Sequence, residues 1–98
     1  QIAAWETIQK SHAIANGVFL ASVNRVGKEE NLTFWGRSFV CDPFGEIIAQ
    51  AGHNTSESLV VECDLNKIEK TRQDWPFLRD RRVDAYQKIT QIYHDPTP

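Results

Sequence analysis

The sequence lacks the features that would assign it to several large classes of protein. Its longest apolar runs, such as GVFLASV, are far shorter than the roughly 20 residues that a membrane-spanning helix needs. Neither sign of charge is in large excess, because 11 basic and 13 acidic side chains leave a net charge of −2. The chain therefore has no general electrostatic attraction for nucleic acid or for an anionic membrane, and we expect neither as a partner.

Cysteine is scarce, methionine is absent, and no secretion signal opens the chain. The two cysteines, Cys41 and Cys63, could form at most one disulfide bond, so we expect free thiols and a cytoplasmic location. The chain begins at Gln1 with a helical pattern already under way. We therefore expect these 98 residues to be the later part of a longer chain, forming one domain or part of one.

The first residues show the apolar spacing of an amphipathic helix. Ile2, Trp5 and Ile8 recur at three-residue intervals, which places them on one helical face. Gly17, preceded by Asn, is a typical left-handed stop for such a helix. The pattern predicts a helix over residues 2–16.

Strand-like segments follow the first helix. Residues 18–24, VFLASVN, are almost continuously apolar, which predicts a central strand covered on both faces, followed by a polar loop, RVGKEEN. Two further strand-like runs, residues 38–41 and 46–50, flank Asp-Pro-Phe-Gly, a sequence typical of a type I turn. These two runs predict a β-hairpin.

The last third of the chain carries one more strand pattern and two helical ones. SLVVECD, residues 58–64, predicts a strand, and Asp64 can cap a short helix that must end before Pro76. A second apolar stripe at helical spacing consists of Val83, Tyr86, Ile89, Ile92 and Tyr93. The order of elements predicts the α/β class, a sheet with helices packed on it, with too few strands to close a layered domain.

Cys41 is the first candidate for a catalytic group, because it lies directly before a turn. A nucleophilic thiol needs an exposed sulfur and surroundings that stabilise the thiolate, whereas Phe39, Val40 and Pro43 make its surroundings apolar. We therefore interpret Cys41 as a buried strand thiol. The three histidines, His12, His53 and His94, have no metal-ligand spacing, and we expect no metal or organic cofactor.

The loop GKEENLTFWG places charged residues beside two aromatic ones. Lys28, Glu29 and Glu30 precede Phe34 and Trp35, a mixture that could line a pocket for a cationic, partly apolar ligand. The alternative is a solvated loop whose aromatic side chains pack on the sheet edge. In residues 67–88, basic and acidic side chains alternate, which favours salt-bridged docking over a phosphate-binding patch.

Two long segments resemble the C-terminal third of the nitrilase superfamily of carbon–nitrogen hydrolases: HAIANGVFLASVNRVGKEENLTFWGRSFVCDPFGEIIAQAG and DLNKIEKTRQDWPFLRDRRVDAY. Within the superfamily the chain is most similar to the N-carbamoylputrescine amidohydrolases. The resemblance implies the C-terminal part of a single four-layer α-β-β-α sandwich, residues 1–98. It also implies a Cys nucleophile, a Glu base and a Lys, all of which lie upstream of this segment, so no catalytic residue is assigned here.

The resemblance further implies a small N-carbamoyl amine substrate, hydrolysed to putrescine, carbon dioxide and ammonia. Residues 72–98, the C-terminal arm, are expected at a subunit interface of a homo-oligomer. Pocket-edge or interface roles are expected for six residues: Asn24, Arg25, Glu29, Glu30, Phe34 and Trp35. Two alternatives stay open, namely another amidase of the superfamily, such as a β-ureidopropionase, and a non-catalytic scaffold or assembly segment.

Overall fold

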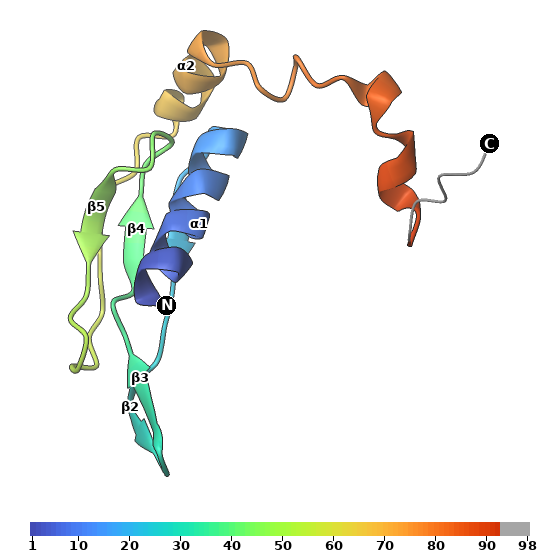
Figure 1. The fold of residues 1–98 in the computed structure, drawn as a ribbon. Helices are drawn as coiled ribbons and strands as arrows, with labels where there is room; N and C mark the ends of the chain where they lie inside the picture. Colours follow the sequence, from blue (N-terminus) through green and yellow to red (C-terminus); the bar gives the residue numbers. More distant parts are fainter. Residues whose placement is uncertain (93–98) are drawn as a thin grey trace.

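The computed structural model describes residues 1–92, and the sequence-based predictions for Tyr93 and His94 lie outside that range. The chain forms a helix, a three-stranded sheet, a separate two-stranded hairpin, a second helix and two short 3-10 turns (Figure 1). The helices and turns are α1 (Ile2–Asn16), α2 (Asn66–Asp74), η1 (Val83–Ala85) and η2 (Gln87–Thr90). The strands are β1 (Leu20–Ser22), β2 (Val26–Glu29), β3 (Leu32–Trp35), β4 (Phe39–Cys41) and β5 (Ile47–Gln50).

The first helix matches its predicted bounds, and its end follows from Gly17. Gly17 adopts a left-handed conformation with φ 63°. Its N–H donates to the carbonyl of Ile14, and the N–H of Val18 donates to the carbonyl of Ala13. These two bonds form a Schellman motif, which satisfies carbonyl groups that the last helical turn would leave unpaired. No helix within residues 1–92 is both long and apolar enough to span a bilayer.

The three-stranded sheet is antiparallel in the order β1-β4-β5, and α1 lies across one of its faces. Its core consists of Ala13, Phe39 and Cys41, with Leu20 opposite Cys41 in the register. The ring of Trp5 meets Phe39 edge to face at 5.6 Å. The predicted β4–β5 hairpin is confirmed, and its Asp42–Gly45 turn is closed by the N–H of Gly45 donating to the carbonyl of Asp42.

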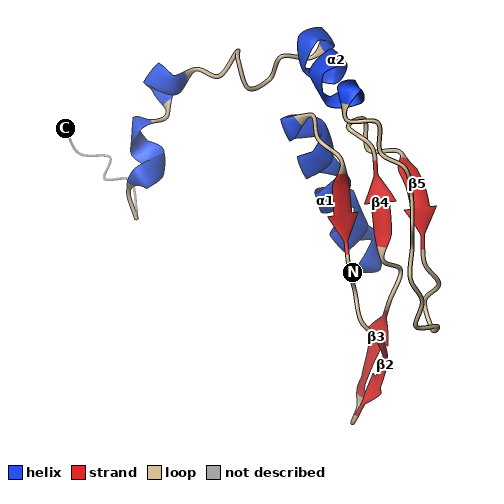
Figure 2. Ribbon diagram, turned by 180° about the vertical axis from the view of Figure 1, so that it is seen from behind, coloured by secondary structure: helices blue, strands red, loops and turns tan. Residues whose placement is uncertain are grey.

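Two predictions for residues 18–35 are wrong. Only Leu20–Ser22 pair as a strand, and in the described residues no helix covers the second face of the sheet, which Figure 2 shows. Val23 is accordingly 90% exposed. The predicted polar loop is instead mostly strand β2 of the β2–β3 hairpin. The chain reverses at the tip of this hairpin, where Glu30 adopts the left-handed conformation (φ 53°).

Two further predictions fail in the last part of the described chain. Residues 58–64 form no strand, although burial alternates along them, with Leu59, Val61 and Cys63 half-buried and the residues between them exposed. Two 3-10 turns replace the second predicted helix, and Ile89 of its apolar stripe is 80% exposed. Helices and strands gain most of their stability from packing and pairing, and within residues 1–92 neither segment is paired into a sheet.

The chain is extended as a whole. Its radius of gyration is 17.9 Å, whereas a compact domain of this length would have about 13 Å. The cause is visible in Figures 1 and 2: after α2 the chain runs away from the sheet toward η1 and η2. The described part of the C-terminal arm therefore contributes nothing to the core on α1.

Replacing Phe39 with alanine should lower the free energy of unfolding by about 3–5 kcal/mol, because a fully buried ring is lost beside Trp5. Urea unfolding followed by circular dichroism measures the loss. Phe77→Ala is the matched control, since Phe77 is 51% exposed, and its loss should be clearly smaller. Equal losses for the two variants would contradict this description of the core.

Candidate functional site

Four of the six predicted site residues lie on the β2–β3 hairpin or directly before it, and the side chains of three of them contact one another. The side-chain amide of Asn24 donates to the carbonyl of Gly36 at 2.9 Å, and its carbonyl oxygen accepts the N–H of Arg25. The Arg25 guanidinium lies 4.3 Å from the ring centroid of Phe34 and forms an ion pair of 2.6 Å with Glu29. Arg25 thus joins Glu29 and Phe34 in one cluster, and Asn24 binds backbone groups at the base of the hairpin.

The other two predicted residues take no part in the contacts of Arg25, although Trp35 lines a cavity of about 210 Å³ together with Phe34. Glu30 is exposed at the tip of the hairpin. Trp35 is the strand partner of Val26, and its side chain is 59% exposed. Together with His53 it lines a shallow hollow. The ion pair between Arg25 and Glu29 is itself solvent-exposed, and such pairs contribute little to stability.

The residues after β3 make a tight turn that sequence reasoning missed. Gly36 and Arg37 both have left-handed backbones, with φ 64° and 59°. The N–H of Gly36 donates to the carbonyl of Arg25, and the N–H of Arg37 donates to the carbonyl of Gly52. A side chain at position 36 would be crowded, because its Cβ would lie 2.5 Å from Cγ1 of Val26. No residue pattern in the sequence signals the positive φ of Arg37.

Ser38 completes the hydrogen bonding at this turn. Its hydroxyl accepts the N–H of Asn24 at 2.7 Å and donates to the carbonyl of Asn24 at 3.2 Å. A cavity of about 320 Å³ opens beside these bonds, lined by Val23, Asn24, Arg25, Val26, Gly36, Arg37, Ser38, Ala51, Gly52, Thr55, Ser56 and Glu57. Asn24 and Arg25 therefore lie at the edge of a cavity, and Arg37 is a lining residue that the sequence did not indicate.

Cys41 is buried in β4, which confirms the prediction of a buried strand thiol. Burial raises the pKa of this thiol, and the negative charge of the adjacent Asp42 raises it further. A thiol held in its protonated form inside an apolar cluster is a poor nucleophile. Cys63 is half-buried and free.

The sequence pattern indicated Asp42 only as the first residue of a turn, but its carboxylate has a larger structural role. Its side chain is 2% exposed. One carboxylate oxygen, Oδ1, accepts the N–H groups of Phe44 and Glu46 at 2.9 Å each, and Oδ2 accepts a hydrogen bond of 2.7 Å from Lys67 of α2. Burial alone would raise the pKa of Asp42, but these hydrogen bonds and the charge of Lys67 outweigh it and hold the pKa below its usual value.

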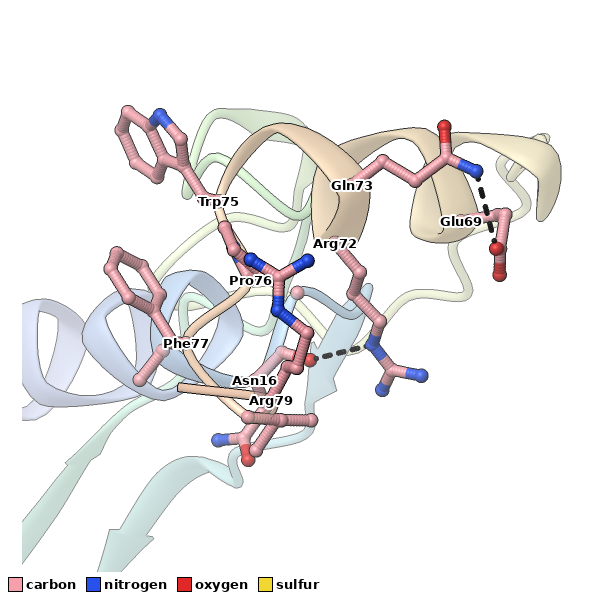
Figure 3. Close-up of a pocket in the computed structure, with 11 residues that line it drawn as sticks. Asn16, Glu69, Arg72, Gln73, Trp75, Pro76, Phe77 and Arg79 are labelled. Carbon is pink, nitrogen blue, oxygen red and sulfur yellow. Dashed lines mark hydrogen bonds between the residues drawn. The ribbon is translucent and has the colours of Figure 1, made fainter. Parts of the chain in front are cut away.

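A further cavity, of about 350 Å³, lies where the end of α1, the last turn of α2 and the start of the C-terminal arm meet (Figure 3). Its polar side chains include Asn16, Glu69, Arg72, Gln73 and Arg79, and its aromatic ones are Trp75 and Phe77. Within residues 1–92 no group of three His, Cys, Asp or Glu side chains could hold a metal ion. The described chain thus offers several polar cavities, including these two and the hollow at Trp35, and a buried carboxylate.

Comparison with known proteins gives consistent results. The carbon–nitrogen hydrolase family model matches residues 2–73. The N-carbamoylputrescine amidase of Arabidopsis thaliana is 41% identical over 93 residues, which cover 87% of this chain and 31% of that protein. The omega-amidase NIT2 of Homo sapiens is 37% identical over 86 residues, covering 86% of this chain and 30% of that protein.

A crystal structure of a carbon–nitrogen hydrolase from Helicobacter pylori G27 superposes with a TM-score of 0.90 at 46% identity, covering 96% of this chain and 34% of that one. The superposition confirms the predicted α/β class and the similarity to the nitrilase fold. The chain spans about a third of the length of the curated relatives that it matches.

The Gly36→Ala variant should lose more stability than Gly27→Ala, although both glycines have positive φ. Each substitution costs about 1–2 kcal/mol for a left-handed backbone. At position 36 the added Cβ would also clash with Val26 and with the carbonyl of Gly52, which costs roughly 1–3 kcal/mol. At position 27 no atom lies within 4 Å of such a Cβ, so no clash is added. Equal unfolding midpoints in urea would show that the turn relaxes without cost.

The Asp42→Asn variant should be less stable than the wild type at pH 7 by roughly 1–3 kcal/mol, since a charged hydrogen-bond acceptor is lost. The folded-state pKa of Asp42 is depressed, so its contribution is complete above the unfolded value of about 3.9 and is lost as the pH falls through the folded value. The stability gap between wild type and variant should therefore close at low pH.

Urea unfolding at pH 7 and pH 3 measures this gap. The control is Asp80→Asn, whose ion pair with Arg79 is exposed, and this variant should show almost no gap at either pH. A gap for Asp42→Asn that is the same at both pH values would contradict the assigned ionisation of Asp42.

Proposed function

Because this chain belongs to the carbon–nitrogen hydrolase family, we propose that it is the C-terminal part of an enzyme that hydrolyses N-carbamoylputrescine to putrescine, carbon dioxide and ammonia. The observation that carries this substrate is the similarity to plant N-carbamoylputrescine amidases, which are 40–41% identical to the chain in four species. The omega-amidases of four mammals are less similar, at 34–37% identity.

The proposed chemistry follows the Cys, Glu and Lys set that the resemblance implies, located in the part of the enzyme that precedes this chain. The thiolate attacks the carbamoyl carbon, and Lys stabilises the oxyanion of the tetrahedral intermediate. Glu delivers a proton to the departing ammonia and then activates the water that hydrolyses the thioester-like intermediate. The reaction requires neither a metal nor an organic cofactor.

The described residues support a scaffold role for this chain in that enzyme. Cys41 has no exposed sulfur and a raised pKa, so we assign the nucleophile elsewhere. Asn24 and Arg25 line the cavity at the hairpin base, which supports their proposed role at the edge of a pocket. For Glu29, Glu30, Phe34 and Trp35 we retain the proposal of a pocket-edge or interface role.

We further propose that the C-terminal arm, residues 72–98, packs on a second copy in a cytoplasmic homo-oligomer. Its described part exposes large apolar side chains, among them Phe77 at 51%, Val83 at 66% and Ile89 at 80%. Two exposed ion pairs lie within it, between Arg79 and Asp80 and between Arg82 and Asp84. Exposed apolar side chains of this size are suited to burial at a subunit interface.

Ammonia release by the full-length enzyme tests the substrate. We expect kcat/KM for N-carbamoylputrescine to exceed that for N-carbamoyl-β-alanine by about 100-fold or more, because one site cannot pair well with both an ammonium and a carboxylate. Preference for N-carbamoyl-β-alanine would instead support a β-ureidopropionase. A folded enzyme inactive on every amide, ureido acid and nitrile tested would support the non-catalytic scaffold.

Two variants test the scaffold role within the same assay. Cys41→Ala should keep most of the activity, whereas replacement of the proposed upstream cysteine should abolish it. A Cys41→Ala enzyme that folds normally and releases no ammonia would refute the structural assignment of Cys41.

A further inference from the structure

The shallow hollow beside Trp35 lies between the end of β3 and the loop that follows β5. Figure 2 shows that loop at the same end of the sheet as the β2–β3 hairpin. The N–H of Arg37 donates to the carbonyl of Gly52 at 3.0 Å, which joins the loop to the chain after β3. The hollow has a volume of about 550 Å³, within the range of small-molecule sites. It is lined by Trp35, Arg37, Gln50, Ala51, Gly52 and His53.

Arg37 has a backbone conformation that is unfavourable for its side chain. Its φ is 59°, directly after Gly36 with a φ of 64°. Glycine adopts a left-handed backbone freely, whereas an arginine in the same conformation costs stability. Residues held in such conformations cluster at binding and catalytic sites. The arginine at this position therefore points to a role for its guanidinium beyond the turn itself.

The guanidinium of Arg37 gives the hollow a positive charge. Among residues 1–92 it has no hydrogen-bond or ion-pair partner, and no carboxylate is among the described residues that line the hollow. Two carboxylates lie nearby. Glu6 accepts a weak hydrogen bond of 3.5 Å from Gln50, and Glu57 lines the neighbouring cavity that Arg37 also lines. The hollow thus presents an unpaired cation to solvent.

The indole of Trp35 supplies an apolar surface beside that cation. Its side chain is 59% exposed, and no aromatic ring within the described range stacks on it. His53 contributes a second ring to the lining. An exposed indole next to an unpaired guanidinium combines the two surfaces that a small anion with an apolar body needs.

We propose that this hollow binds a small monocarboxylate that carries a flat ring. The guanidinium of Arg37 pairs with the carboxylate, because its planar fork matches the two oxygens of that group. The flat ring stacks on Trp35. One guanidinium balances one negative charge, which favours a carboxylate over a phosphate dianion. Trp35 is thereby assigned to the edge of a pocket and not to a subunit interface. The inference does not depend on which substrate the hydrolase accepts.

Isothermal titration of the full-length protein with benzoate tests the proposal, because benzoate combines one carboxylate with a flat ring. We expect saturable binding with a dissociation constant of about millimolar order. Acetate, which lacks the ring, and benzyl alcohol, which lacks the charge, should bind more weakly. Arg37→Gly should weaken benzoate at least tenfold. Trp35→Leu should weaken benzoate about two- to tenfold and leave the affinity for acetate unchanged.

Urea unfolding separates a lost ligand contact from a damaged fold. Because glycine relieves the left-handed backbone, Arg37→Gly should unfold at the same or a higher urea concentration than the wild type. The matched control is Lys70→Gln, which removes an exposed cation outside the lining and should keep the affinity for benzoate. If Arg37→Gly does not fold, Arg37→Lys replaces it, and loss of the fork should still weaken benzoate.

The absence of saturable benzoate binding at concentrations of about 10 mM would overturn the proposal, as would equal affinity in the wild type and Arg37→Gly. A Trp35→Leu protein that sediments as a smaller oligomer would also overturn it, because Trp35 would then lie in a subunit interface. None of these results bears on ammonia release, so the proposed hydrolase can fail or succeed separately.

Discussion

The buried carboxylate of Asp42 is the interaction on which the arrangement of the chain depends most. A charge that is almost fully removed from water must be matched by hydrogen bonds, and Asp42 has three, two within its own turn and one from Lys67. The two amide bonds shape the β4–β5 turn. The bond from Lys67 fixes α2 against that turn, and the Phe44–Trp75 contact fixes the start of the C-terminal arm to it. The Asp42–Gly45 turn thereby connects the sheet, the second helix and the start of the arm.

The parts of the fold that local chemistry determines could be predicted from the sequence. Gly17 ends α1 as expected, and Asp-Pro-Phe-Gly closes the β4–β5 hairpin. Asp64 accepts the N–H of Asn66 at the start of α2, and that helix ends before Pro76 as predicted. Each of these signals acts within a few residues of the structure that it specifies, so a single sequence is sufficient to detect it.

The errors lie where the outcome depends on residues that are distant in sequence or outside the described chain. The apolar alternation of residues 58–64 and the stripe from Val83 to Ile92 indicate surfaces, but they do not indicate what covers them. The charged residues of β2 resemble a loop, and strand pairing overrides that pattern. At the candidate site, the contact between Arg25 and Phe34 follows from hairpin closure, whereas the cavity at Arg72 arises from a contact between residues 56 positions apart.

The close packing of Arg72 on Gly17 has a consequence for how the chain can change during evolution. A side chain at position 17 would need both a strained backbone and the space that the stem of Arg72 occupies. A shorter residue at position 72 would free that space but would leave the carbonyl of Asn16 without its arginine donor. The two positions are therefore coupled in one direction: a side chain at position 17 requires a residue at position 72 that leaves the space of the arginine stem free.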